Sequence, residues 1–173
     1  MKILVACEES QAVTIELRKL GHEAYSCDIE PCSGEHQEWH LQVDALELLK
    51  MQWDMIIAFP PCTYLTNAGA MRLRVNGEIQ LERLEKARAA REFFMQFYNV
   101  DCPKVAVENP LPGKIHKLPP YSQIVEPYMF GDPWKKKNLL MAARVAVPDG
   151  YGYCNARRTL GGGHQFAPRR KDI

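Results

Sequence analysis

The stretch KILVACEESQAVTIELRKLGHEAYSCD, residues 2–28, decides the fold of this chain. Its first part, 2–7, is a short continuous apolar run, which is typical of a buried parallel strand. Apolar residues then recur at the spacing i, i+4, i+7 of one helical face, with Ser10 as the expected N-cap and Gly21 as the expected residue after the helix. The segment 22–28 predicts a second strand. Together these parts predict a right-handed β-α-β unit.

The rest of the chain continues this alternation of strands and helices. Four further strands are expected at 53–59, 104–108, 122–126 and 138–142, helices at 44–50 and 80–98, and polar loops at 29–42 and 63–78. The alternation predicts an α/β sandwich with a mainly parallel sheet, whose ligand site lies beyond the carboxyl ends of the strands. We expect one domain over 1–147 and a flexible tail, rich in Gly, Pro and Arg, over 148–173.

Composition narrows the possible classes of protein. The chain has 173 residues, which suits one domain, and its 22 Lys and Arg against 21 Asp and Glu give a net charge of +1. A histone-like polycation is therefore excluded. Six cysteines without regular spacing make no disulfide scaffold, and no apolar run is long enough for a membrane span. The absence of a leader-like segment makes us expect a cytoplasmic protein with no membrane partner.

Polar residues follow the first two expected strands and bear on the cofactor. Asp28 ends the second strand, where an acid usually binds a ribose hydroxyl. The first turn has no glycine fingerprint and carries Glu8 and Glu9 instead, which would repel a pyrophosphate. These residues favour a nucleoside cofactor that has no phosphates.

A thiol and a carboxyl group follow two later strands. Cys62 stands behind two prolines that end one apolar run, and Glu108 ends the next. A thiol and a carboxyl group that face each other suit attack on a pyrimidine ring. The thiolate adds to one ring carbon while the acid holds a proton on a ring nitrogen.

Three motifs carry a resemblance to a known family. They are FPPCT at 59–63, VENP at 107–110 and FGDPWKKKNLL at 130–140, and they resemble the Pro-Pro-Cys, Glu-Asn and aromatic-Gly-x-Pro segments of DNA cytosine-5 methyltransferases, in the family's order. The chain looks most like the short members found in phages and prophages, which lack the target-recognition region.

The resemblance implies a Rossmann-like class I methyltransferase fold, a three-layer sandwich, with S-adenosyl-L-methionine as methyl donor. It implies that Cys62 adds to C6 of cytosine, that Glu108 contacts N3 and the exocyclic amine, and that C5 receives the methyl group, with DNA as the substrate. No metal is implied. The implied cofactor-binding residues are Cys7, Glu8, Glu9, Asp28, Asp44, Phe59 and Pro60, of which Glu8 or Glu9 would receive the ammonium group of the methionine part. The implied substrate-binding residues are Pro61, Thr63, Asn109 and Lys136.

The chain also departs from the family pattern, which leaves alternatives open. The segment 6–10 replaces an aromatic-x-Gly-x-Gly turn, Lys136 stands where paired arginines are usual, and no final motif follows 143. One alternative is a degenerate, non-catalytic module that binds nucleic acid or a protein partner. Another is an enzyme of the same fold that acts on a free pyrimidine nucleotide. Single-stranded DNA, or DNA presented by a partner protein that supplies the missing elements, would also suit a chain without a recognition region.

Two further groups have both a plain and a functional interpretation. Cys27, Cys32, His36 and His40 have the side chains of a zinc site, yet their spacing matches no standard finger, so an incidental polar loop is the other interpretation. The lysine run 135–137 is typical of a solvated edge strand and also of a phosphate contact.

Overall fold

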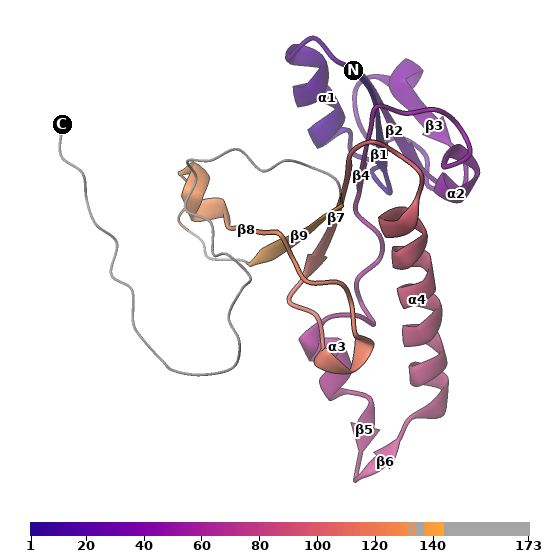
Figure 1. Cartoon of the computed structure of the whole chain (residues 1–173), viewed down its shortest axis with the longest axis vertical. Helices are drawn as coiled ribbons and strands as arrows, with labels where there is room; N and C mark the ends of the chain where they lie inside the picture. The colour runs from indigo at the N-terminus through magenta and orange to yellow at the C-terminus, as the bar shows by residue number, and fades with distance from the viewer. Residues whose placement is uncertain (132, 134–136, 144–173) are drawn as a thin grey trace, which may run out of the picture.

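A seven-stranded mixed sheet forms the centre of the molecule, in the order β3-β2-β1-β4-β7-β9-β8 (Figure 1). The computed structural model describes residues 1–131, 133 and 137–143. The first five strands in this order pair in parallel, and β9 runs antiparallel to both of its neighbours. The strands are β1 Lys2–Ala6, β2 Glu23–Asp28, β3 His40–Gln42, β4 Met55–Ala58, β7 Val105–Pro110, β8 Gln123–Val125 and β9 Asn138–Ala143.

Helices lie on both faces of this sheet. Figure 1 shows α1 and the long α4 on opposite sides of β1 and β4. The α-helices are α1 Ala12–Lys19, α2 Ala45–Leu48, α3 Asn67–Met71 and α4 Leu81–Asn99. A small hairpin of β5 Arg74–Val75 and β6 Glu78–Ile79 and three 3-10 turns, η1 Gln37–Trp39, η2 Lys114–His116 and η3 Pro127–Phe130, complete the described elements. This arrangement confirms the predicted fold class, a Rossmann-like three-layer α/β sandwich with a mainly parallel sheet.

The alternation of side chains along the strands divides the core into two layers. In β1, Leu4 and Ala6 face α4 and pack in one cluster with Phe94 and Phe97, while the odd residues of the strand face the other way and pack against α1. All four of these side chains are fully buried. Because β1 is buried on both faces, its sequence is a continuous apolar run, which is why the strand was predictable.

The start of α1 differs from the prediction. Gln11, not Ser10, is the N-cap residue, and its own side chain makes no cap hydrogen bond. Glu8 takes this role: its carboxylate accepts hydrogen bonds from the amides of Val13 and Thr14, at 2.6 and 3.3 Å, and from the Thr14 hydroxyl at 2.6 Å. A carboxylate at a helix N-terminus satisfies free amides and complements the helix dipole. Gly21 does follow the helix with φ of 82°, as predicted.

Two segments predicted as polar loops contain regular structure. Residues 29–42 include η1 and the edge strand β3, which pairs in parallel with β2. Residues 63–78 include α3 and most of the β5-β6 hairpin, whose turn residues Asn76 and Gly77 both have positive φ, 51° and 85°. Positive φ at both positions is the type I′ turn that Asn-Gly favours.

The predicted tail 148–173 lies outside the described residues, so its division from the domain 1–147 stays a prediction. In the described part, none of the helices has the length and apolar character that a membrane crossing requires.

Candidate functional site

A cavity of about 220 Å³ opens at the carboxyl ends of β1 and β2, between the sheet and the helices α2 and α4. Its lining residues come from five separate segments and are Cys7, Asp28, Ile29, Asp44, Ala45, Pro61 and Phe93. Four of them, Cys7, Asp28, Asp44 and Pro61, belong to the predicted site. The volume is below the ~300–1,000 Å³ of typical small-molecule pockets, so the cavity suits part of a cofactor, such as a nucleoside.

Two carboxylates give the cavity its polarity. Asp28 ends β2 and is half-buried, and its Oδ1 accepts a hydrogen bond from the Glu30 amide at 3.1 Å. Asp44 is the N-cap of α2, as predicted, and its Oδ1 accepts from the Leu46 amide at 2.9 Å. Each Oδ1 atom is held by backbone, and this fixes the orientation of both carboxylates. Such a wall disfavours phosphate and favours hydroxyl, amine or cationic groups.

Cys7 forms the wall between these two acids. It directly follows β1 and has a φ of 59°, in the left-handed region. Burial, reinforced by the negative charges of Asp28 and Asp44 and by the neighbouring Cys27, raises the pKa of the Cys7 thiol to about 12. The thiol is therefore neutral at physiological pH, and Cys7 serves the cavity as a small apolar surface and not as a nucleophile.

The two glutamates after Cys7 do not line this cavity. Glu8 is buried and caps α1, so its carboxylate is already engaged by three donors. The Glu9 carboxylate accepts a hydrogen bond from the Ser33 hydroxyl, and its carbonyl accepts one from the Ser33 amide at 3.0 Å. The pair therefore holds α1 and the loop after β2 in place. Reception of a cofactor's ammonium group by either residue stays a prediction.

The segment 59–63 leads from β4 across the mouth of the cavity. Phe59 donates its amide to the Ala6 carbonyl at 3.0 Å, and its ring packs in the layer that faces α1. Pro60 is buried, and Pro61 is exposed at the cavity wall. Thr63 is exposed next to the half-buried Cys62. Of the two residues predicted for the cofactor pocket, neither Phe59 nor Pro60 lines the cavity found here.

Cys62 and Glu108 stand at the carboxyl ends of neighbouring parallel strands. In the β4-β7 ladder Ala58 pairs with Val107, so Glu108 is one residue past the last pair and Cys62 is four residues past it. The Cys62 carbonyl accepts hydrogen bonds from the amides of Leu65 and Thr66, at 2.9 and 3.1 Å. Leu65 is fully buried and anchors this turn, so the thiol is presented from a fixed loop.

The loops that follow these two strands are joined to each other. The Asn67 amide donates to the Leu111 carbonyl at 2.8 Å, the Gly113 amide donates to the Leu65 carbonyl at 2.9 Å, and Thr66 and Pro112 form an isolated β-bridge. Sequence reasoning placed the thiol and the carboxyl on one rim. The joined loops are consistent with that placement.

Asn109 and Lys136 complete the predicted substrate set. Asn109 is fully buried in β7, its Nδ2 donates to the Pro110 carbonyl, and its Oδ1 is buried with no hydrogen-bond partner among the described residues. It is thus placed to stiffen the end of β7 behind Glu108. Lys136 lies outside the described residues, as do positions 134 and 135 of the same segment.

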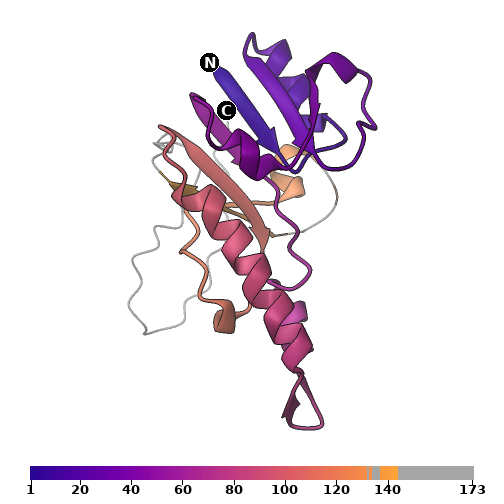
Figure 2. The same cartoon turned by 90° about the vertical axis from the view of Figure 1, so that its right-hand side faces the viewer.

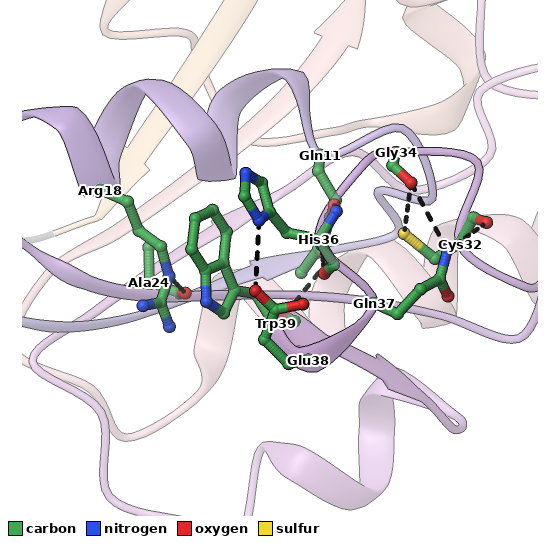
Figure 3. A network of polar contacts seen from close by, with 10 residues as sticks. Gln11, Arg18, Ala24, Cys32, Gly34, His36, Gln37, Glu38 and Trp39 are labelled. Carbon is green, nitrogen blue, oxygen red and sulfur yellow. Dashed lines mark hydrogen bonds and ion pairs between the residues drawn. The ribbon is translucent and has the colours of Figure 1, made fainter.

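The four zinc-type side chains have separate partners, and Figure 3 shows two of them, Cys32 and His36. The Cys27 thiol is directed to the Val43 carbonyl at 3.2 Å, and the Cys32 thiol to the Gly34 carbonyl at 3.7 Å. Figure 3 shows the His36 ring stacked on Trp39, with centroids 3.6 Å apart. His40 contacts the Ser26 hydroxyl at 2.9 Å. In the described part of the chain, no group of three or more such side chains is arranged to hold a metal.

The side-chain amide of Gln11, which is buried, also holds the loop that carries these residues. The Gln11 side chain donates to the His36 carbonyl at 2.7 Å and accepts from the His36 amide at 3.0 Å (Figure 3). Gly34 allows this close approach, since a Cβ there would lie 2.5 Å from Gln11 Oε1 and 2.8 Å from the Ser10 carbonyl. The loop after Asp28 is therefore ordered by Gln11, and this favours a structural role for the segment.

Sequence reasoning missed three residues of the cavity wall. Ile29 is 69% exposed at the cavity, although it is a large apolar side chain. Phe93 reaches the cavity from α4, and Ala45 from the first turn of α2. Together they provide an apolar surface next to the two carboxylates, which suits the flat face of a base beside its ribose. The available signals were the positions of Ile29 and Ala45, directly after Asp28 and Asp44.

Comparisons with known proteins complete the description of the site. No family profile and no curated protein sequence matches the chain. Among solved structures it is similar to an E. coli protein that is provisionally described as a DNA modification methyltransferase encoded within a prophage. The TM-score is 0.48 and the identity 13%, over 82% of this chain and 46% of that one, so the chain spans about half the length of that structure.

Proposed function

We propose that this protein transfers a methyl group from S-adenosyl-L-methionine to C5 of cytosine in DNA. The observation that carries the proposal is the order β1-β4-β7, which puts the cavity, the loop of Cys62 and the end of Glu108 on consecutive strand ends. In open parallel sheets ligands bind at this edge. A nucleophile, a carboxyl group and a nucleoside-sized cavity along one edge form the set that the reaction needs.

The residues of the cavity fit the cofactor. Asp28 is the candidate partner of the ribose hydroxyls, and Asp44 is the candidate partner of the adenine amine. Ile29 and Phe93 offer apolar surface to the base, and the neutral thiol of Cys7 adds no charge to a wall that is already acidic. An acidic wall without a phosphate-binding turn suits a nucleoside that carries a cationic sulfonium. When bound, S-adenosyl-L-methionine supplies the electrophilic methyl group.

The proposed steps use two residues of this chain. The Cys62 thiolate adds to C6 of cytosine, so that a carbon–sulfur bond forms while Glu108 holds a proton at N3 and withdraws electron density from the ring. The ring carbon C5 becomes nucleophilic and accepts the methyl group. A water molecule then takes the proton from C5, the electrons of that bond expel the Cys62 thiolate from C6, and the N3 proton returns to Glu108, which restores the aromatic ring. Both residues are regenerated, so the net reaction consumes the cytosine and the methyl donor and releases the neutral thioether and one proton.

The test is a methylation assay with labelled S-adenosyl-L-methionine on duplex DNA, single-stranded DNA and dCMP in parallel. We expect label in DNA, and a covalent adduct with DNA that carries 5-fluorocytosine, because the fluorine blocks the final elimination. Cys62→Ser should abolish both the label in DNA and the covalent adduct. Cys102→Ser changes a buried thiol just before the amino end of β7 and should keep both. Label in dCMP alone would favour the free-nucleotide enzyme. Cofactor binding without methylation of any of the three substrates would favour the binding module.

A further inference from the structure

An arm projects from the sheet on the side of the candidate site. We define the arm as residues 67–88, which comprise α3, the β5-β6 hairpin and the first two turns of α4. Figures 1 and 2 show the hairpin at the far tip of the molecule, with α4 running from the tip back along the sheet. The chain enters the arm directly from the loop of Cys62, so the arm extends from the edge where a substrate would bind.

The hairpin of the arm is held by hydrogen bonds within the arm. Its tip is a type I′ turn, and the Arg74 guanidinium donates to the Gly77 carbonyl at 3.0 Å. The Gln80 amide donates to the Leu73 carbonyl at 2.9 Å, and Leu73 is buried at the base of the hairpin. An ordered two-stranded ribbon that stands in solvent presents its side chains in fixed directions.

The surface of the arm is more apolar and more basic than folding requires. Met71 is 76% exposed and Leu81 70%, and both flank the hairpin strands. The hairpin itself exposes Val75 and Ile79. The arm carries five cations, Arg72, Arg74, Arg83, Lys86 and Arg88, and three acids, Glu78, Glu82 and Glu85, on a chain whose net charge is only +1. Lys86 pairs with Glu82 at 2.6 Å. Such a mixture of cations and apolar side chains suits a polyanion that also has apolar surface.

The arm is tied to the loop of the nucleophile. The Arg83 guanidinium lies over the Tyr64 ring, 5.0 Å from its centroid, and its Nε donates to the Gly69 carbonyl at 3.3 Å. Tyr64 is two residues from Cys62 in the same loop. A ligand held by the arm is therefore held at a fixed place relative to the candidate thiol.

From these observations we infer that the arm is a duplex-binding element, in which the hairpin lies in a groove of DNA and Arg72 and Arg74 contact phosphates beside the target. A two-stranded ribbon fits the major groove, and guanidinium groups are well suited to phosphates. The exposed apolar side chains then lie against sugars and base edges. The inference rests on the proposed function only in taking DNA as the substrate.

The test compares three double variants by fluorescence anisotropy with a labelled short duplex, from ~50 to ~200 mM salt. R72Q/R74Q should lower the affinity roughly 10-fold, and it should reduce the slope of log affinity against log salt by about 1 for each arginine that no longer neutralises a phosphate. R72K/R74K should restore the slope, because the charge remains. K50Q/K104Q removes the same charge at the amino ends of the strands and should behave as the unmodified protein.

The outcomes separate the arm from the chemistry. An unchanged affinity and slope in R72Q/R74Q, or equal losses in R72Q/R74Q and K50Q/K104Q, would overturn the inference even if the protein methylates DNA. Duplex binding that depends on the arm, without methylation, would uphold it while the proposed function fails. Sedimentation that shows self-association through Met71 and Leu81 would overturn it in favour of a protein interface. A melting temperature equal to that of the unmodified protein, measured without ligand, shows that each variant is folded.

Discussion

Two regions of the molecule, the half of the sheet beside the cavity and the arm, differ in where their apolar residues lie. Ile3, Leu4 and Val5 of β1 are fully buried, whereas Met71 and Leu81 of the arm are 76% and 70% exposed. The charge differs too, since the cavity is acidic and the arm is basic. Burial in the core explains why β1 is apolar. The exposed apolar side chains and the positive charge of the arm are explained better by contact with another molecule.

The largest expected effect contrasts two positions of α4, one in each region. Phe97 is fully buried against the sheet, so Phe97→Ala should lower the free energy of unfolding by ~3–5 kcal/mol through reduced burial and a cavity. Leu81 lies at the arm end of the same helix and is exposed. Leu81→Ala should therefore change the free energy of unfolding by no more than ~0.5 kcal/mol. Urea denaturation measures both. Similar losses in the two variants would mean that the arm belongs to the cooperative core.

The next effect concerns the carboxylate that caps α1. Glu8→Gln replaces an acceptor of three hydrogen bonds by an amide with one acceptor oxygen, and should lower the free energy of unfolding by ~1.5–3 kcal/mol. Thermal unfolding measures this, and the stabilisation by S-adenosyl-L-methionine should be unaltered. Glu9→Gln is the control, with an effect within ~0.5 kcal/mol. If Glu8→Gln instead weakens the binding of S-adenosyl-L-methionine and leaves the free energy of unfolding unchanged, Glu8 binds the ammonium group of the cofactor.

High pH should affect the cavity region. The Cys7 thiol has a pKa of about 12 in the folded protein against an ordinary value of 9.0, so between these values the unfolded chain ionises first. The contribution of this group to stability should therefore be constant below pH 9 and fall above it, by up to ~1.4 kcal/mol per pH unit. Burial also raises the pKa of Cys27, to about 11, and adds to the fall. Cys7→Ser should make the fall shallower in denaturation series across this range. An unchanged slope would contradict a buried, acid-flanked thiol.

Low pH should affect the base of the arm, with a smaller effect. His116 of η2 is 6% exposed and its Nε2 is buried with no hydrogen-bond partner among the described residues, and burial lowers the pKa of its ring. The unfolded chain therefore binds a proton first, so stability should fall as the pH drops below about 6.5. His116→Phe should remove this part of the acid dependence, as measured by thermal unfolding at several pH values. An acid limb identical in the variant would show that other groups cause it.

The sequence predicted the elements that are buried on both faces. β1, β4 and β7 were identified because parallel strands inside a sandwich are continuous apolar runs. β3 was missed because an edge strand of three residues, His40–Gln42, has no such run. The hairpin was missed although Asn76-Gly77 is a strong turn signal, because each of its strands has only two residues and no alternating pattern.

The residues of the candidate site also differ in whether the sequence could predict their roles. Cys7 and Asp28 were foreseen at one crevice because the carboxyl ends of parallel strands share an edge, whereas Asp44 was implied only by the family resemblance. The structure puts all three on one cavity. Phe93 was not foreseen, because its arrival there depends on how α4 crosses the sheet. Glu8 was assigned to the cofactor because its place after β1 says nothing about the helix amides that engage it. Roles that depend on long-range packing are the ones that a sequence leaves open.

The Asn76-Gly77 turn also has a consequence for how such a chain can be lengthened. It is an exposed tip, and exposed tips are where proteins tolerate inserted residues and protease cleavage. Each doubling of a flexible loop costs only ~0.6 kcal/mol in closure entropy. Residues added at this point would extend the reach of the ribbon and leave the distant sheet undisturbed. The turn is thus a natural insertion point, where a fusion tag or an additional segment can be grafted onto the sandwich.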